Sequence, residues 1–179
     1  MPTLDFLRYP IGKPDIPRKI GPTQLKAWIG NIEEFPEKLY QLTKNLNNQQ
    51  LDTVYRKGGW TIRQVVHHCY DSHHNSYTRY KWALTEASPL IKAYDEKKWA
   101  ALFDTSQAPI QLSINSLFAL HAKWVFLLKG MTTADFNKTF IHPEGNEQVS
   151  LAENTGIYAW HCEHHFAHIA HLISTKNWS

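Results

Sequence analysis

The chain has 179 residues, of which 42% are hydrophobic and 20% are charged, the composition of a soluble globular protein. No stretch approaches the roughly 18 unbroken apolar residues of a membrane span, and the first ten residues lack the apolar run of a secretion signal. The 19 basic and 16 acidic residues are mixed along the chain, so neither a nucleic acid nor a membrane is an expected partner. With only two cysteines, Cys69 and Cys162, we expect a cytoplasmic protein that forms a single domain over residues 1–179.

The first part of the chain predicts an arm followed by a long helix. Residues 1–22 hold five of the nine prolines and are expected to form an extended arm over the surface. From Leu25 to Leu46 the apolar residues recur at helical spacing, which predicts one amphipathic helix bent at Pro36. Residues 47–59 then form a connection.

The middle of the chain predicts two further long helices. Thr61 and Gln64 have the spacing of a capping box, which predicts a helix from Thr61 to about Glu86. Residues 89–109 are mixed, with a short helix expected near 95–102. Another helix is predicted over 112–129, with Gly130 as its stop signal.

The last part predicts a hairpin and a final helix. Residues 138–149 allow one short β-hairpin, with Gly145 and Asn146 suited to its turn. Ser150 and Glu153 again have capping-box spacing and predict a helix that runs to about Thr175. Four long helices in one small domain predict an all-α fold, a four-helix bundle, in which facing side chains can build metal and ligand sites.

Histidine is the unusual residue of this composition, because nine of the 11 histidines lie in residues 67–74 and 161–171. At 100° per residue, His161 and His165 lie in the middle of the apolar face of the last helix, and Glu163 lies opposite. Two histidines spaced i and i+4 can bind one metal ion, although buried histidines with ordinary hydrogen bonds show the same spacing. Cys162 follows His161, so this is not the HExxH motif of metalloproteases.

A third ligand has to come from another helix. The predicted helix that starts at Thr61 offers four histidines, and helical angles alone do not choose among them: His67, His68, His73 and His74. His164 and His168 are either further groups of the site or ordinary core and surface side chains. Cys69 and Cys162 are expected to be packing residues, because each lies 100° from a neighbouring histidine of interest.

Four segments of the chain resemble the YfiT branch of the DinB superfamily. They are YPIGK (residues 9–13), GGWTIRQVVHHCYDSHHNSY (58–77), YDEKKW (94–99) and YAWHCEHHFAHI (158–169). The resemblance implies a DinB-like four-helix bundle, a homodimer, and one divalent metal ion per chain, zinc or nickel. The ligand positions of the family fall on His68, His161 and His165.

The resemblance also implies a function, a metal-dependent hydrolase that acts on a small molecule. Some relatives are similar to thiol S-transferases, so transfer of a low-molecular-weight thiol is the main alternative, and a metal-binding protein without turnover is a third. A metal on three neutral imidazoles keeps an open position, as catalytic sites require. No general base can be assigned from the sequence, although Asp71, one turn after His68, is a candidate to orient that imidazole.

Overall fold

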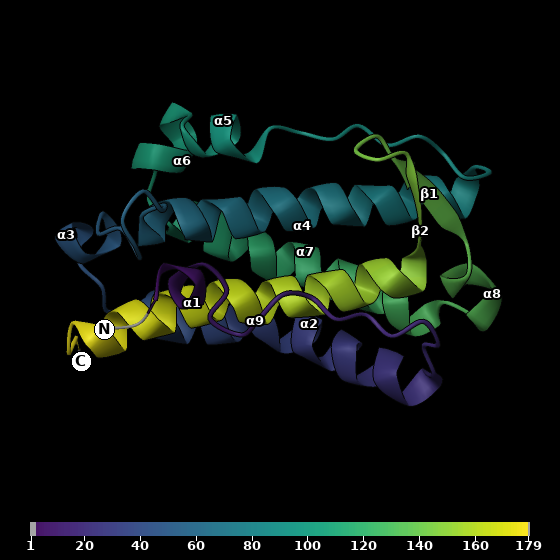
Figure 1. The fold of residues 1–179 in the computed structure, drawn as a ribbon, viewed down its shortest axis with the longest axis horizontal. Helices are drawn as coiled ribbons and strands as arrows, with labels where there is room; N and C mark the ends of the chain where they lie inside the picture. The colour runs from purple at the N-terminus through teal and green to yellow at the C-terminus, as the bar shows by residue number, and fades with distance from the viewer. Residues whose placement is uncertain (1–2, 179) are drawn as a thin grey trace.

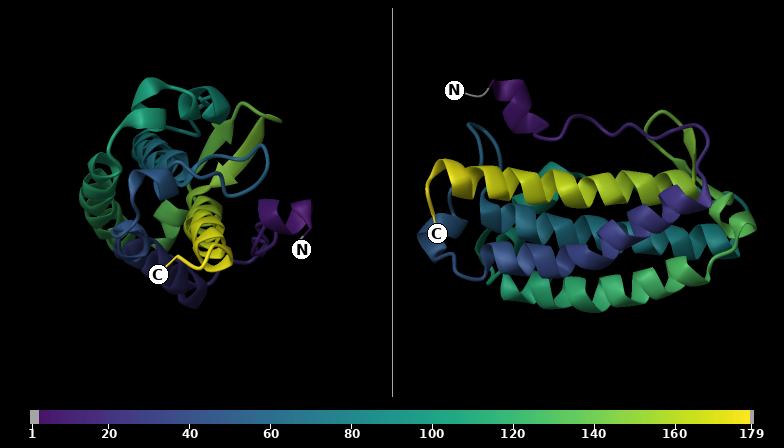
Figure 2. Two further views of the ribbon diagram at one scale, coloured as in Figure 1. Left: turned by 90° about the vertical axis from the view of Figure 1, so that its left-hand side faces the viewer. Right: turned by 90° about the horizontal axis from the view of Figure 1, so that it is seen from below.

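Four long helices lie side by side in the computed structural model, which describes residues 3–178 (Figure 1). They are α2 (Pro22–Thr43), α4 (Ile62–Thr85), α7 (Gln111–Gly130) and α9 (Leu151–Thr175). Helices α7 and α9 each pack against both α2 and α4, so α2 and α4 lie diagonally across the bundle (Figure 2). Fully buried aliphatic and aromatic side chains from all four helices fill the space between them, as the predicted four-helix bundle requires.

Helices α4 and α9, which carry the predicted metal site, both begin at the capping boxes that the sequence predicted. The Thr61 side chain accepts from the Gln64 amide and the Gln64 side chain accepts from the Thr61 amide, which closes the capping box of α4. Ser150 and Glu153 form the same arrangement at the start of α9. A capping box satisfies two backbone amides that a helix leaves free, and this fixes the first residue of each helix.

The connections between the long helices carry the smaller elements. Helices α4 and α7 run in the same direction in Figure 1, so the chain returns along the bundle between them and forms α5 (Glu96–Ala100) and α6 (Phe103–Gln107) on the way. Strands β1 (Thr139–His142) and β2 (Glu147–Ser150) pair in antiparallel register, Thr139 opposite Ser150, and form the predicted hairpin. Gly145 and Asn146 both adopt positive φ in its turn. None of the helices within residues 3–178 has the length and hydropathy that crossing a membrane requires.

Several local predictions need correction. The arm is not extended throughout, because α1 (Leu4–Arg8) forms where Thr3 caps the amide of Phe6, and the extended part begins after it. Two four-residue helices, α3 (Asn48–Leu51) and α8 (Thr133–Phe136), were also not predicted. The short helix expected near 95–102 is confirmed as α5, but α6, which follows it, was not predicted. Gly130 is the last residue of α7 rather than the residue beyond it.

The arm crosses the outer side of α9 and is held there by hydrogen bonds (Figure 2). The indole of Trp160 donates to the carbonyl of Gly12 at 3.2 Å, and His168 Nε2 lies 3.2 Å from the carbonyl of Arg8. Residues 3–20 therefore cover the part of α9 that carries the histidines.

Gly156 sets how closely the arm and α2 approach α9. A Cβ at this position would lie 2.8 Å from Trp28 Cη2 and 2.9 Å from Ile16 Cδ1, whereas a Cβ at Gly30 in α2 would meet nothing within 4 Å. We expect Gly156→Ala to lower the free energy of unfolding by about 1–3 kcal/mol through overpacking. Gly30→Ala is the matched control and should raise it by up to about 1 kcal/mol, because alanine favours helix. Urea denaturation measures both; equal stabilisation by the two changes would contradict the close packing.

Candidate metal centre

Three histidines from two helices converge between α4 and α9. His68 lies in the second turn of α4, and His161 and His165 lie one turn apart in the middle of α9. One ring nitrogen from each of the three lies within 4.8 Å of the other two. His68 and His165 are buried, whereas His161 is half-buried, so the cluster is not sealed off. The structure thus brings together the three residues that the family resemblance implied.

The geometry of this cluster fits a shared metal ion. His68 Nε2 lies 3.2 Å from His161 Nε2. Two nitrogens bound tetrahedrally at 2.0–2.1 Å from one zinc ion are about 3.3 Å apart, so the two rings need little movement to share an ion. His165 Nδ1 is buried and has no hydrogen-bond partner among residues 3–178, and the same is true of His164 Nδ1 and His168 Nδ1. A buried nitrogen without a partner is costly, and a bound cation would satisfy the cluster.

Burial keeps these imidazoles neutral, which is the form that binds metals. Desolvation lowers the pKa of His68 from 6.5 to about 3. Desolvation, followed by the neighbouring imidazoles, lowers the pKa of His161 and of His165 well below 6.5. A free lone pair is therefore available on each ring near neutral pH without the loss of a proton.

A second group of histidines lies beside the first and shares one member with it. Ring nitrogens of His164, His165 and His168 also lie within 4.8 Å of one another. This group is enclosed by aromatic rings, with Tyr55 stacked on His168 at 4.1 Å and Trp160 stacked on His164 at 4.3 Å between ring centroids. The charge of Arg56 contributes to a lowered pKa of His168, about 4, after desolvation. A positive neighbour disfavours a cation here relative to the first cluster.

Two further histidines extend the cluster into the core behind His161. His161 Nδ1 lies 3.0 Å from His73 Nε2, and His73 Nδ1 lies 2.8 Å from His121 Nε2. Both rings are fully buried, at 0% and 1% exposure. His73 was one of four open candidates in the sequence, and His121 was missed. Its position in the apolar row Ile114, Leu117, His121 and Trp124 of α7 was the available signal.

The remaining histidines of α4 point elsewhere. His67 faces α7, where its ring lies 2.7 Å from Ser113 Oγ and 3.1 Å from the carbonyl of Ala108. His74 is exposed. Of the four candidates that the sequence left open, only His68 and His73 therefore take part in the cluster.

Asp71 does not take the role suggested for it. It makes no hydrogen bond to His68 among residues 3–178, and it lines a separate cavity with His67 and Asp104. Burial, then the charge of Asp104, raises the pKa of Asp71 to about 6. Cys69 and Cys162 are buried free thiols, and burial raises the pKa of both, as expected of packing residues.

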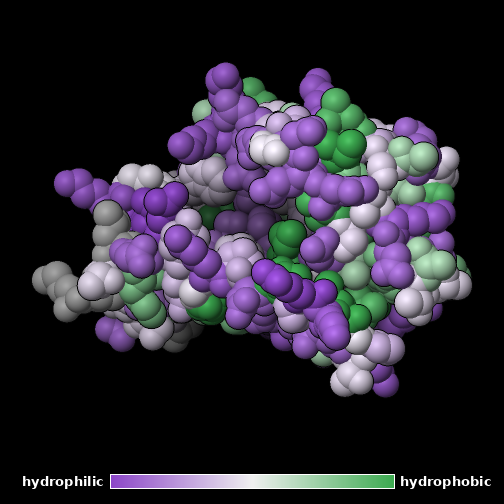
Figure 3. Space-filling model, turned by 45° about the vertical axis from the view of Figure 1, so that its right-hand side comes forward, coloured by the Kyte–Doolittle hydropathy of each residue, from purple (hydrophilic) through white to green (hydrophobic). Residues whose placement is uncertain are grey.

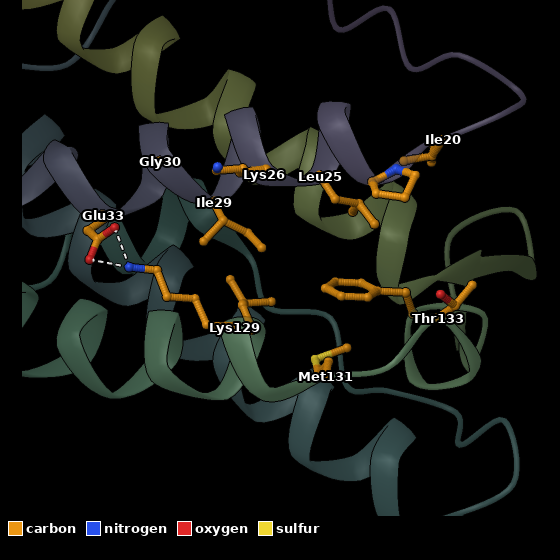
Figure 4. Close-up of a pocket in the computed structure, with 12 residues that line it drawn as sticks. Ile20, Leu25, Lys26, Ile29, Gly30, Glu33, Lys129, Met131 and Thr133 are labelled. Carbon is orange, nitrogen blue, oxygen red and sulfur yellow. Dashed lines mark hydrogen bonds and ion pairs between the residues drawn. The ribbon is translucent and has the colours of Figure 1, made fainter.

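Concave surface is present on more than one side of the molecule. Figure 3 shows a hollow with a largely hydrophilic rim on the face that combines the front and right-hand side of Figure 1. A separate groove lies between the start of α2 and the end of α7, lined by apolar side chains with the Glu33–Lys129 ion pair at one end (Figure 4). No histidine lines this groove, so it is distinct from the candidate metal centre.

Known proteins are similar to this chain in both sequence and fold. Residues 31–169 match the model of the DinB superfamily. A protein of Oceanobacillus iheyensis named "Putative metal-dependent hydrolase" is 47% identical over 96% of this chain and 98% of its own. A Bacillus cereus protein of the same name is 51% identical over 98% of this chain and 100% of its own.

A solved structure agrees with these relatives. YfiT from Bacillus subtilis, described as "a probable metal-dependent hydrolase with an unusual four-helix bundle topology", superposes with a TM-score of 0.95 at 45% identity. The match covers 97% of this chain and 99% of that one. On the family match and this near-complete coverage, the chain belongs to the DinB superfamily.

Proposed function

We propose that this protein is a metal-dependent hydrolase of a small molecule, with one divalent ion held by His68, His161 and His165. The observation that carries the proposal is the convergence of these rings, with His68 Nε2 3.2 Å from His161 Nε2. The names of the relatives from Oceanobacillus and Bacillus support the same activity. Zinc and nickel are the ions we propose, because both accept imidazole ligands.

The protein's own contribution to such a reaction is position and charge. A divalent ion, when bound, acts as a Lewis acid and lowers the pKa of a nucleophile that binds to it. The three imidazoles are neutral, so they leave the full positive charge of the ion in place. His68 and His165 are buried and His161 is half-buried, so little water surrounds the three rings.

Transfer of a low-molecular-weight thiol is a second candidate, and one observation favours it. The hydrogen-bond partners described for His68 and His161 are themselves imidazoles, and neither group of clustered histidines includes a carboxylate. Hydrolysis usually needs a general base within hydrogen-bond reach of the attacking water. A thiol loses its proton more readily than water and needs less help from a base.

A direct comparison of substrates separates the two activities. We expect the metal-loaded protein to cleave a small activated ester or amide without added thiol, and the His161→Ala variant to lose this activity. If transfer is the activity, the protein will instead join a small thiol to a chloro-nitroarene, with release of chloride, and will leave the ester intact. If the metal binds but neither reaction proceeds above the His161→Ala background, the third reading, a metal-binding protein without turnover, replaces both.

Two finer properties stay predictions. Elemental analysis of the purified protein would test the expectation of one zinc or nickel ion per chain. Sedimentation equilibrium would test the homodimer that the family resemblance implies.

A further inference from the structure

A row of hydrogen bonds runs from helix α2 to the proposed metal site. It starts at the carbonyl of Ile32, which lies 2.6 Å from His121 Nδ1. His121 Nε2 is 2.8 Å from His73 Nδ1, and His73 Nε2 is 3.0 Å from His161 Nδ1. Two imidazoles, one from α7 and one from α4, thus join one backbone carbonyl to the nitrogen of His161 that faces away from His68.

The carbonyl at the start of this row is free because of a proline. In a regular helix the carbonyl of residue 32 would accept from the amide of residue 36, four positions later. Residue 36 is Pro36, which has no N–H, so this bond cannot form within α2. A buried carbonyl without a partner is costly, and the His121 ring supplies the missing donor.

The carbonyl of Ile32 determines which atom donates in every hydrogen bond of the row. A carbonyl only accepts, so His121 Nδ1 carries a proton and its neutral ring leaves Nε2 as an acceptor. His73 Nδ1 must then donate to His121, which leaves His73 Nε2 as an acceptor for the proton on His161 Nδ1. His161 is therefore held with its lone pair on Nε2, the atom that faces His68 Nε2 at 3.2 Å.

We infer that Pro36, His121 and His73 are positioning residues that fix His161 in the tautomer and orientation needed to bind the metal. Packing holds the row in place, since the ring of Phe35, from the same turn of α2, contacts both His73 and His121 at centroid distances of 5.2 and 5.8 Å. Metal-binding histidines ordinarily use a carboxylate or a carbonyl for this purpose. Here the carbonyl of Ile32 acts through two intervening imidazoles, those of His121 and His73, which connect it by hydrogen bonds to His161.

The inference can be tested first without any metal. Long-range proton–nitrogen correlation spectra of the metal-free, ¹⁵N-labelled protein report which ring nitrogen of each histidine carries the proton, and single substitutions assign the signals. We expect the proton on Nδ1 in His121, His73 and His161. A proton on Nε2 of His161 would overturn the inference, and this measurement does not depend on the proposed function.

Metal affinity gives the second readout, which does rest on the proposed site. We expect His73→Phe to weaken binding of cobalt(II), followed by its visible absorption, by about 10–100-fold, the usual cost of losing such a partner. His73→Gln keeps an acceptor oxygen and should lose less. His121→Phe and Pro36→Ala should weaken binding in the same direction while touching no ligand.

His67→Phe is the matched control for these variants. His67 is a buried, hydrogen-bonded histidine of the same helix, but it faces α7 and not the cluster. The His67→Phe variant should be less stable than the wild-type protein and should keep the wild-type affinity for cobalt(II). If His73→Phe and His121→Phe fold and keep wild-type affinity, the row has no positioning role. If the wild-type protein binds no cobalt(II), the proposed function fails, and the tautomers still decide the inference.

Discussion

Replacing His161 with alanine is expected to abolish metal binding and leave the fold in place. The change removes one of the three proposed ligands, so the loss of affinity should exceed the 10–100-fold that removal of a supporting partner costs. The bundle does not depend on this ring, because fully buried side chains such as Ile32, Leu39 and Leu117 hold the four helices together. Elemental analysis after dialysis against zinc or nickel measures the metal, and far-ultraviolet circular dichroism measures the fold.

His164→Ala is the matched control for this experiment. It removes a buried imidazole from the same helix, but from the second group of histidines rather than the first. If the ion binds where we propose, His164→Ala retains the metal. Retention by His161→Ala together with loss by His164→Ala would place the ion among His164, His165 and His168 instead. Because His165 belongs to both groups, its replacement would not distinguish them.

The helices that carry the site were predictable because their ends are set by local contacts. The capping boxes at Thr61 and Ser150 give the starts of α4 and α9, and both are formed within four residues of sequence. The four-residue helices α3 and α8 also begin with capping boxes, at Asn47 and Thr132. They were missed because a single turn is too short to show an apolar periodicity.

Helix geometry predicted only the part of the site that lies on a single helix. The spacing of His161 and His165 is a property of α9 alone, and geometry could place them on one face. The choice of His68 over His67 depends on how α4 is rotated against its neighbours, since the two rings point to α9 and α7. The family resemblance supplied that choice. His121 and the carbonyl of Ile32 come from two other helices, so only the packed bundle brings them to His73.

Mild acid is expected to unfold the metal-free protein. Five clustered rings have a pKa lowered by burial: His68 to about 3, His121 to about 4, and His73, His161 and His165 well below 6.5. In the unfolded chain these histidines take up protons near pH 6.5, whereas the native rings do not. Stability is therefore complete above pH 6.5 and falls as the pH drops toward the native pKa values.

The size of this effect makes it decisive. A ring that stays neutral in the native protein costs about 1.4 kcal/mol for each pH unit below 6.5, so His68 and His121 alone, with native pKa values of about 3 and 4, remove about 3 kcal/mol per unit from a total of about 5–15 kcal/mol. Urea denaturation of the metal-free protein at pH 7.5, 6.5 and 5.5 should show this loss. His67→Gln removes one more buried histidine with a lowered pKa, outside the site, and should make the dependence of stability on pH less steep. Constant stability from pH 7.5 to 5.5 would mean that the native cluster takes up protons as readily as the unfolded chain, and that it is not the dry, neutral ligand set on which the metal site depends.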